Sequence, residues 1–189
     1  ASPTEARAVN AIVNTGGRYH LDPDVVEVDW WQVLDLHGRV ARTPEDDRET
    51  RLALLDRVVD LVDGRGWLSG EYLPDLEWGE AERVAATRLL LRLHVTAAEL
   101  HSDTDPRRAH ELYEVACSLD PLNDDVTRRS MTAAARLNDP DAVRARLSLH
   151  HRNLDDVGLE ADPGTDDLAA TLLRTLTPTP GRPPSVPVR

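Results

Sequence analysis

The stretch AHELYEVACSLDP, residues 109–121, decides the fold of this chain. Ala109, Tyr113 and Ala116 are spaced four and three residues apart and share one face of a helix, which Pro121 ends. Small residues on such a face let neighbouring helices approach closely, while the aromatic ring fills the remaining space. This combination is typical of a helix that packs in a repeat, and the stretch contains no reactive group of its own.

The helical pattern continues on both sides of this stretch. Asp105-Pro106 places a capping carboxylate before a proline at the first helical position, and Asp139-Pro140 predicts a second helix start of the same kind. Asn123 or Asp124 caps the helix between them. Apolar residues at helical spacing predict helices over residues 30–40, 44–62, 77–101, 106–119, 124–137, 140–157 and 165–176. We expect the two helix pairs between residues 77 and 157 to stack as a short right-handed solenoid.

The N-terminal segment follows a different pattern. Residues 12–21 predict a short strand, a turn at Gly16-Gly17 and a second strand, and residues 25–28 predict a third extended piece. A hairpin of this size is not stable alone, so we expect it to lean on the helical body or on a preceding domain. At the other end, residues 177–189 are rich in proline and predict an extended or disordered tail.

Together these patterns predict an all-α fold, a tetratricopeptide-like helical repeat bundle of about seven helices with a small N-terminal β-hairpin. The organisation that follows is a hairpin segment at residues 1–28, a helical domain at residues 29–176 and a proline-rich tail at residues 177–189.

The composition narrows the classes of function. A net charge of −12 disfavours a module that binds duplex DNA, which needs a basic face to displace counterions from phosphates. The single cysteine, Cys117, excludes an internal disulfide and suits a reducing cytoplasm, and we expect it to be a buried, inert thiol. No apolar run reaches the length of a membrane span, and no secretory signal begins the chain.

Catalysis and cofactor binding have no motif behind them. The carboxylates at residues 45–47 are adjacent and suit a helix start, whereas acid–base work needs groups that face each other in a pocket. His94, His101 and His110 lack the acid or cysteine that would complete a zinc site. We therefore expect no catalytic residue, no metal and no cofactor.

The order of motifs resembles that of the bacterial transcriptional activator domain, the tetratricopeptide-like module of the actinobacterial antibiotic regulatory proteins. The similar segments are GGRYHL, DPDVVEVDWWQV, RLALLDRVVDLVDGRGWLSG, LEWGEAERV, AHELYEVACSLDPLNDDVTRRSMTAAARLNDPDAVRARL and LDDVGLEADPGTDDLAATL, and the resemblance spans about residues 16–176. The absence of lysine is also typical of a GC-rich genome such as that of an actinobacterium.

The resemblance implies a place for the hairpin. In that family a winged-helix DNA-binding domain precedes the module, and Gly16, Gly17, Tyr19 and Leu21 resemble the end of its wing. The body of the winged helix is absent from this chain, so the resemblance implies DNA contact only through an upstream domain. It further implies self-association, contact with the transcription machinery and a cytoplasmic location. Some relatives carry the module in larger proteins with membrane or peptidoglycan-binding segments.

Five residues are candidate partner contacts. On a helix Trp30 and Trp31 point about 100° apart, so we expect one to enter the core and Trp31 to remain available to a partner. Arginines near helix starts are the other candidates: Arg107, Arg108, Arg128 and Arg129.

The leading hypothesis is a non-catalytic interaction and oligomerisation module of a transcription regulator. The alternative is a small-molecule-sensing domain of a regulatory or membrane-associated signalling protein, with its ligand held between the long helix and the loop at residues 64–74.

Overall fold

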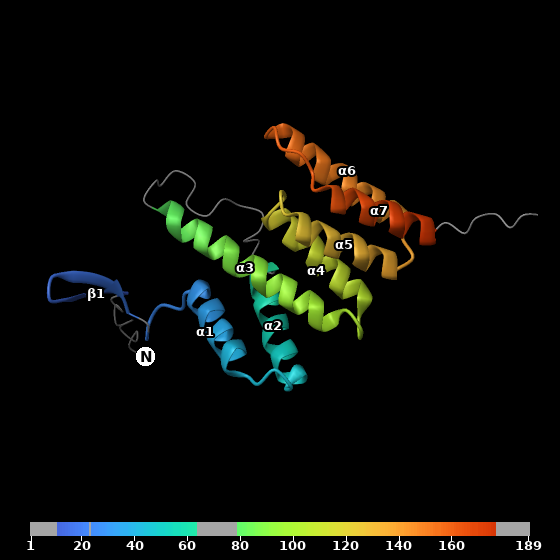
Figure 1. Ribbon diagram of the computed structural model, residues 1–189. Helices are drawn as coiled ribbons and strands as arrows, with labels where there is room; N and C mark the ends of the chain where they lie inside the picture. Colours follow the sequence, from blue (N-terminus) through green and yellow to red (C-terminus); the bar gives the residue numbers. More distant parts are fainter. Residues whose placement is uncertain (1–10, 23, 64–78, 177–189) are drawn as a thin grey trace, which may run out of the picture.

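Seven helices and one β-hairpin make up the parts of the chain that the computed structural model describes, which are residues 11–22, 24–63 and 79–176 (Figure 1). The elements are β1 (Ile12–Thr15), β2 (Arg18–Leu21), α1 (Asp29–Arg42), α2 (Arg48–Asp63), α3 (Glu80–His101), α4 (Pro106–Leu119), α5 (Asp124–Arg136), α6 (Pro140–Asp156) and α7 (Pro163–Leu176). The predicted all-α bundle with an N-terminal hairpin is confirmed.

The helices pack in the order of the chain. Each helix from α1 to α6 contacts the next one, and α7 returns to contact both α5 and α6 (Figure 1). Because the contacts are mainly between neighbours in sequence, the helices form a stack with one end at α1 and the other at α7. This is the arrangement expected of a helical repeat.

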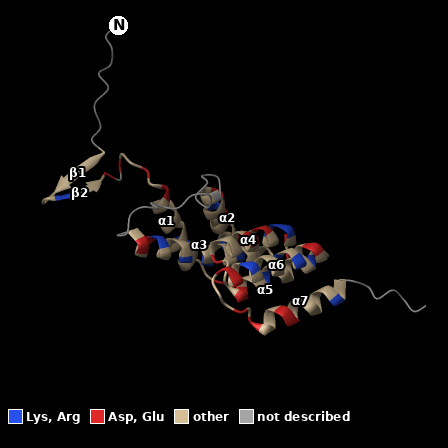
Figure 2. Cartoon of the chain, turned by 90° about the horizontal axis from the view of Figure 1, so that it is seen from above, with Lys and Arg blue, Asp and Glu red and all other residues tan. Residues whose placement is uncertain are grey.

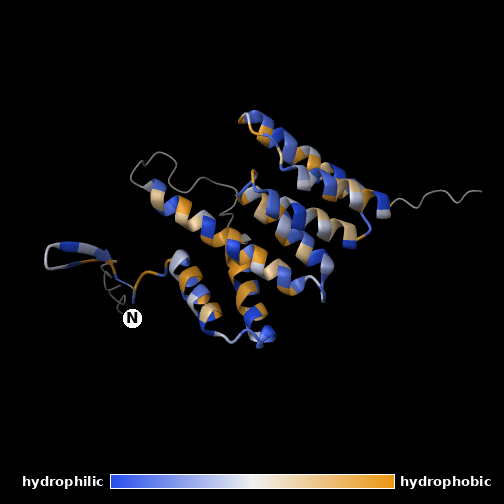
Figure 3. Ribbon diagram, in the orientation of Figure 1, coloured by the Kyte–Doolittle hydropathy of each residue, from blue (hydrophilic) through white to orange (hydrophobic). Residues whose placement is uncertain are grey.

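The main core joins α1 to α4. Its centre is α2, the helix whose buried face is richest in large apolar side chains (Figure 3). The fully buried core side chains of α1 and α2 are Val33, Leu55, Val58, Val59 and Val62. Burying one such side chain contributes about 1.5–3 kcal/mol, so this cluster supplies a large part of the folding free energy.

The alanine face of α4 lies where three helices meet. Ala116 is completely buried and clusters with Cys117 of the same helix and Val126 of α5, against Leu91 and Val95 of α3. A larger side chain at position 116 is expected to overpack this junction, because protein interiors are close-packed. The alanine therefore sets the distance at which α3 and α5 approach α4.

A second, smaller core holds the C-terminal helices together. It consists of Met131, Ala134, Val143 and Ala169, with leucines of α7 packed around it.

The side-chain caps predicted at the starts of α4, α5 and α6 are present. The Asp105 carboxylate accepts a hydrogen bond from Arg108 N at 3.0 Å, Asn123 from Val126 N at 3.2 Å, and Asp139 from Ala142 N at 2.9 Å.

The hairpin stands apart from the helices. Its turn uses Gly16 and Gly17 at φ of 62° and 82°, the left-handed region that a two-residue hairpin turn requires. The hairpin projects away from the helical body, so of the two expected supports the body is not the one used, and support by a preceding domain stays a prediction (Figure 1). The predicted extended piece at residues 25–28 begins as a turn, in which Val25 N and Val26 N bond Asp22 O, and Val28 is extended but belongs to no strand.

The start of α2 differs from the prediction at residue 44. Asp47 N donates to Pro44 O, which makes residues 44–47 a turn, and α2 begins only at Arg48. The Asp47 carboxylate then accepts a hydrogen bond from Thr50 N at 3.1 Å. Asp47 therefore acts as the cap, and Pro44 belongs to the turn before it.

The buried face of α3 begins in the middle of the helix. Val84 in its second turn is 42% exposed, and the first buried leucine is Leu89. From Leu89 onward, α3 packs between α2 and α4. It therefore buries two faces, and its apolar residues do not form one narrow stripe along the helix. Residues 64–78, with the predicted loop and the start of the long helix at residue 77, lie outside the described residues, as does the proline-rich tail.

Replacing the buried alanine with leucine tests the close packing of α4. We expect Ala116→Leu to destabilise the protein by about 1–3 kcal/mol, because the added atoms overpack the junction of α3, α4 and α5. Ala145→Leu, the same change on the exposed face of α6, should alter stability by less than about 0.5 kcal/mol. Urea denaturation measures both, and similar values for the two variants would contradict the packing argument.

Candidate functional site

The groove on the outer side of α4 and α5 is the candidate site. It has a volume of about 250 Å³ and lies between the end of α3, the start of α4 and the length of α5. Its lining residues are Ser102, Pro106, Ala109, Tyr113, Arg128, Arg129, Thr132, Ala133 and Arg136.

The floor of this groove is apolar. Ala109, Tyr113 and Ala133 are each at most 5% exposed, and they come from facing turns of α4 and α5. Because two of the three are alanines, the floor is recessed below the longer side chains around it. A recess of this kind can accept an apolar side chain from a partner.

The rim of the groove is formed by three arginines of α5. Arg129 Nε donates to Asp125 Oδ2 at 2.8 Å, and its Nη1 bonds Glu99 of α3. The hydrogen bond to Asp125 raises the pKa of Arg129 above its ordinary value, so this side chain stays charged. Arg136 donates to Ser102 O at 2.9 Å and to Asp103 Oδ1 at 3.3 Å. The rim is thus ordered by acids of the same chain.

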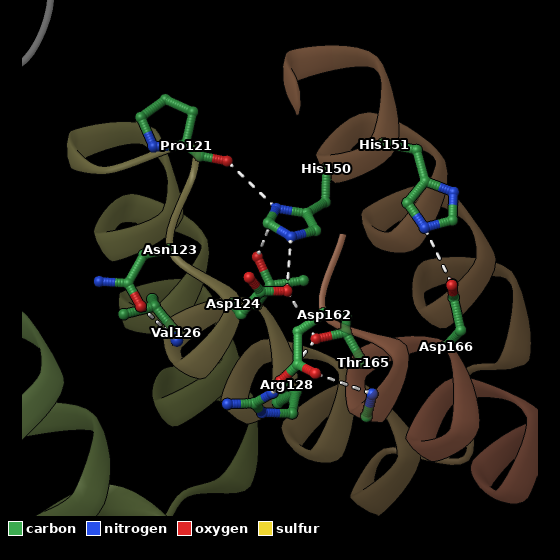
Figure 4. Close-up of polar contacts among 12 residues, drawn as sticks. Pro121, Asn123, Asp124, Val126, Arg128, His150, His151, Asp162, Thr165 and Asp166 are labelled. Atoms are coloured by element: carbon green, nitrogen blue, oxygen red, sulfur yellow. Dashed lines mark hydrogen bonds and ion pairs between the residues drawn. The ribbon is translucent and has the colours of Figure 1, made fainter. Parts of the chain in front are cut away.

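Arg128 connects the groove to α7. Its Nη1 donates to Asp162 Oδ2 at 2.6 Å and lies 3.3 Å from the Thr165 hydroxyl (Figure 4). Thr165 is completely buried and donates to Asp124 Oδ1 at 2.7 Å. The N-terminal turn of α7 is therefore held by polar contacts to the first two turns of α5.

The same carboxylate of Asp124 also faces α6. His150 is buried, with Nε2 at 3.0 Å from Asp124 Oδ1 and Nδ1 at 3.2 Å from Pro121 O (Figure 4). Burial alone would raise the pKa of Asp124, but the hydrogen bonds from Thr165 and His150 outweigh it and hold that pKa below its ordinary value. His150 is thus a core histidine with a hydrogen-bond partner for each ring nitrogen.

The five candidate contact residues fall in three places. Arg128 and Arg129 lie together on the groove rim, in the second turn of α5 and not at its start. Arg108 pairs with Glu111 at 3.4 Å on α4, and Arg107 is exposed beside it, so neither lines the groove. Trp31 is on α1, in a different part of the molecule.

Trp31 lines a second hollow. It is 42% exposed, while its neighbour Trp30 is partly buried against the main core, as their separation around the helix predicts. The hollow has a volume of about 580 Å³ and lies between α1 and the segment that joins it to β2. Val25 and Val28 share the lining with Trp31, so this surface is partly apolar.

Sequence reasoning missed Arg136 and the role of Tyr113 in the groove. Residues 128, 132 and 136 are four apart, so Thr132 and Arg136 lie on the same face of α5 as Arg128. That spacing could have predicted that Arg136 lies beside Arg128. The position of Tyr113 opposite these residues could not be predicted, because it depends on how α4 and α5 pack.

The described residues can be checked for a metal site, a reactive thiol and a membrane span. Within the described ranges, no group of three or more His, Cys, Asp or Glu side chains is placed to hold a metal ion. Cys117 is buried, and its burial raises the pKa of the thiol to about 11, so little thiolate exists at neutral pH. Among the helices described, none combines the length and the apolar content that a membrane crossing requires.

Comparison with known proteins does not extend this description. No family model matches the chain, and no curated protein matches it.

Removing the buried hydroxyl of Thr165 tests the contact between α5 and α7. We expect Thr165→Val to cost about 1–3 kcal/mol near pH 7, because Asp124 loses a hydrogen bond to its charged form. The lowered pKa of Asp124 means that this stability is present above the pKa of the unfolded state and is lost as pH falls through the folded value.

The difference in unfolding free energy between wild type and Thr165→Val should therefore shrink between about pH 7 and pH 3. Thr175→Val removes a hydroxyl that bonds its own helix on the exposed face of α7, and it serves as the control. A difference that grows on acidification would contradict this account.

The thiol of Cys117 gives a direct test of its burial. Because its pKa is raised to about 11, we expect no reaction with a disulfide reagent such as dithionitrobenzoate at about pH 8 in the folded protein. The same reagent should titrate one thiol per chain in guanidinium. Rapid labelling of the native protein would show an accessible, activated cysteine.

Proposed function

We propose that this chain is a non-catalytic protein-interaction and oligomerisation module of a bacterial transcriptional regulator. The observation that supports it best is the groove with an apolar floor, between α4 and α5, whose rim is formed by Arg128, Arg129 and Arg136. Arginine and tyrosine around a small recess are the residues that most often dominate protein interfaces. The resemblance of the motif order to bacterial transcriptional activator domains points to the same function.

The groove suits a partner segment with an apolar anchor flanked by carboxylates. The anchor would fill the recess over Ala109 and Ala133, and the partner carboxylates would exchange with Asp103, Asp125 and Asp162 as partners of the rim arginines. Exchange of one carboxylate for another leaves no arginine uncompensated, so its free-energy cost is small. An acidic second copy of this chain, or an acidic segment of the transcription machinery, has this chemistry.

DNA contact is assigned in this proposal to an upstream winged-helix domain, and the module itself acts in the cytoplasm. Charges of both signs are spread over the helices, and the arginines do not form one continuous basic face (Figure 2). With a net charge of −12, the chain lacks the electrostatic attraction that drives proteins onto duplex DNA.

A carboxylate placed in the groove tests the proposal. We expect the wild-type chain to show a mass that rises with concentration in light scattering, or to bind purified actinobacterial RNA polymerase. Thr132→Glu should weaken the observed association by about tenfold, since it repels an acidic partner and competes for the rim arginines. Thermal denaturation would check that the variant remains folded.

The control is Thr171→Glu, which adds the same charge to the exposed face of α7, away from the groove. It should leave association unchanged. A chain that stays monomeric at all concentrations and does not bind the polymerase would refute the proposed function, whereas equal losses in both variants would refute the groove as its site.

A further inference from the structure

The turn that joins α6 to α7, residues 157–162, carries two apolar side chains that the rest of the chain does not cover (Figure 1). Val157 is 57% exposed and Leu159 is 53% exposed, more than any other valine or leucine in the described ranges. A single exposed apolar side chain is common on a protein surface, but two on one turn form a small patch that a partner can bury.

The backbone of this turn is ordered. Leu159 N donates to Leu154 O at 2.9 Å, and Gly158 N donates to Asp155 O at 3.0 Å. These two hydrogen bonds close α6 in a Schellman motif, and Gly158 supplies the φ of 70° that the motif requires. The apolar side chains therefore stand on a fixed turn, and little backbone entropy is lost when they bind.

Carboxylates surround the two apolar side chains. Asp155, Asp156 and Glu160 are exposed, and in the part of the chain that the structure describes none of the three forms an ion pair. Asp162 lies at the end of the turn and bonds Arg128 of the groove rim. The turn thus has an apolar centre with negative charge around it, which is the chemistry that the arginine-rimmed groove requires of a partner.

We propose that the groove between α4 and α5 binds this turn of a second copy of the chain. Leu159 of the second copy would enter the recess over Ala109 and Ala133, because it is the longer of the two apolar side chains, and Val157 would pack beside it. Glu160 would then meet the rim arginines. The inference rests on the proposed function, since it names the partner of the same groove.

The position of the turn beside the groove favours a closed dimer. Arg128 on the rim donates to Asp162, so the two surfaces lie next to each other on one chain (Figure 4). A two-fold axis can therefore bring the turn of each copy to the groove of the other, which gives two identical contacts. An acidic segment of RNA polymerase would fill the groove but leave Val157 and Leu159 exposed. A second copy covers both surfaces, which favours it as the occupant.

The test is self-association of the whole chain, measured by sedimentation equilibrium over a range of concentrations. We expect the wild type to form a dimer and nothing larger. Leu159→Ser should weaken dimerisation by about tenfold or more, because the apolar anchor of both contacts is lost. Glu160→Arg should also weaken it, since the new positive charge faces the rim arginines, and it decides the question if Leu159→Ser does not fold.

The control is Leu34→Ser, which removes a leucine that is 43% exposed on α1, outside the groove. It should leave dimerisation unchanged. Binding of RNA polymerase, where it occurs, should survive Leu159→Ser, because that variant keeps an intact groove.

Mixing two defective variants tests the reciprocal arrangement. Leu159→Ser keeps the groove and Thr132→Glu keeps the turn, so a mixed pair retains one of the two contacts. The chain has no lysine, so an amine-reactive dye labels Thr132→Glu only at its N-terminus. Under conditions in which each variant alone is monomeric, we expect the labelled chain to sediment as a dimer when unlabelled Leu159→Ser is added.

Three results would overturn the inference. The first is dimerisation that is unchanged in both Leu159→Ser and Glu160→Arg. The second is a mixture of Leu159→Ser and Thr132→Glu that stays monomeric although the wild type dimerises. The third is a wild-type chain that binds RNA polymerase but never dimerises, which leaves the proposed function standing. Only a chain that does neither contradicts both.

Discussion

The close approach of α3 and α5 to α4 is the constraint on which this structure depends. It is set by Ala116, whose side chain is completely buried among residues of all three helices. Because successive helices pack on one another in this way, each helix pair buries its apolar face against the next, and none could be stable alone. The polar contacts of the C-terminal helices come second to this packing. They fix the orientation of α7 on the stack of packed helices.

The groove is a direct consequence of the same small residues. Where α4 and α5 meet beside the end of α3, an alanine floor lies below a rim of long arginine side chains. The rim arginines come from one face of α5, so their positions are set by the helix and not by a loop. Because the rim arginines stand on a rigid helix, little backbone entropy is lost when a partner binds. The groove is therefore preorganised for binding.

Local signals predicted much of the fold, and tertiary contacts account for the remainder. The caps at Asp105, Asn123 and Asp139 could be read from sequence because a cap bonds a backbone group only two or three residues away. Pro44 was misjudged because a proline suits both a turn and a first helical position. The grouping of Arg128 with Arg129 followed from the sequence. Their acid partners, Glu99 on α3 and Asp162 just before α7, are distant in sequence and depend on how the helices pack.

The ion pairs of the groove arginines limit what a partner can gain there. In an acidic chain, an arginine at the surface finds a carboxylate easily, and the groove arginines have each done so. A partner at the groove can therefore only exchange one ion pair for another, which gives specificity and salt dependence more than affinity.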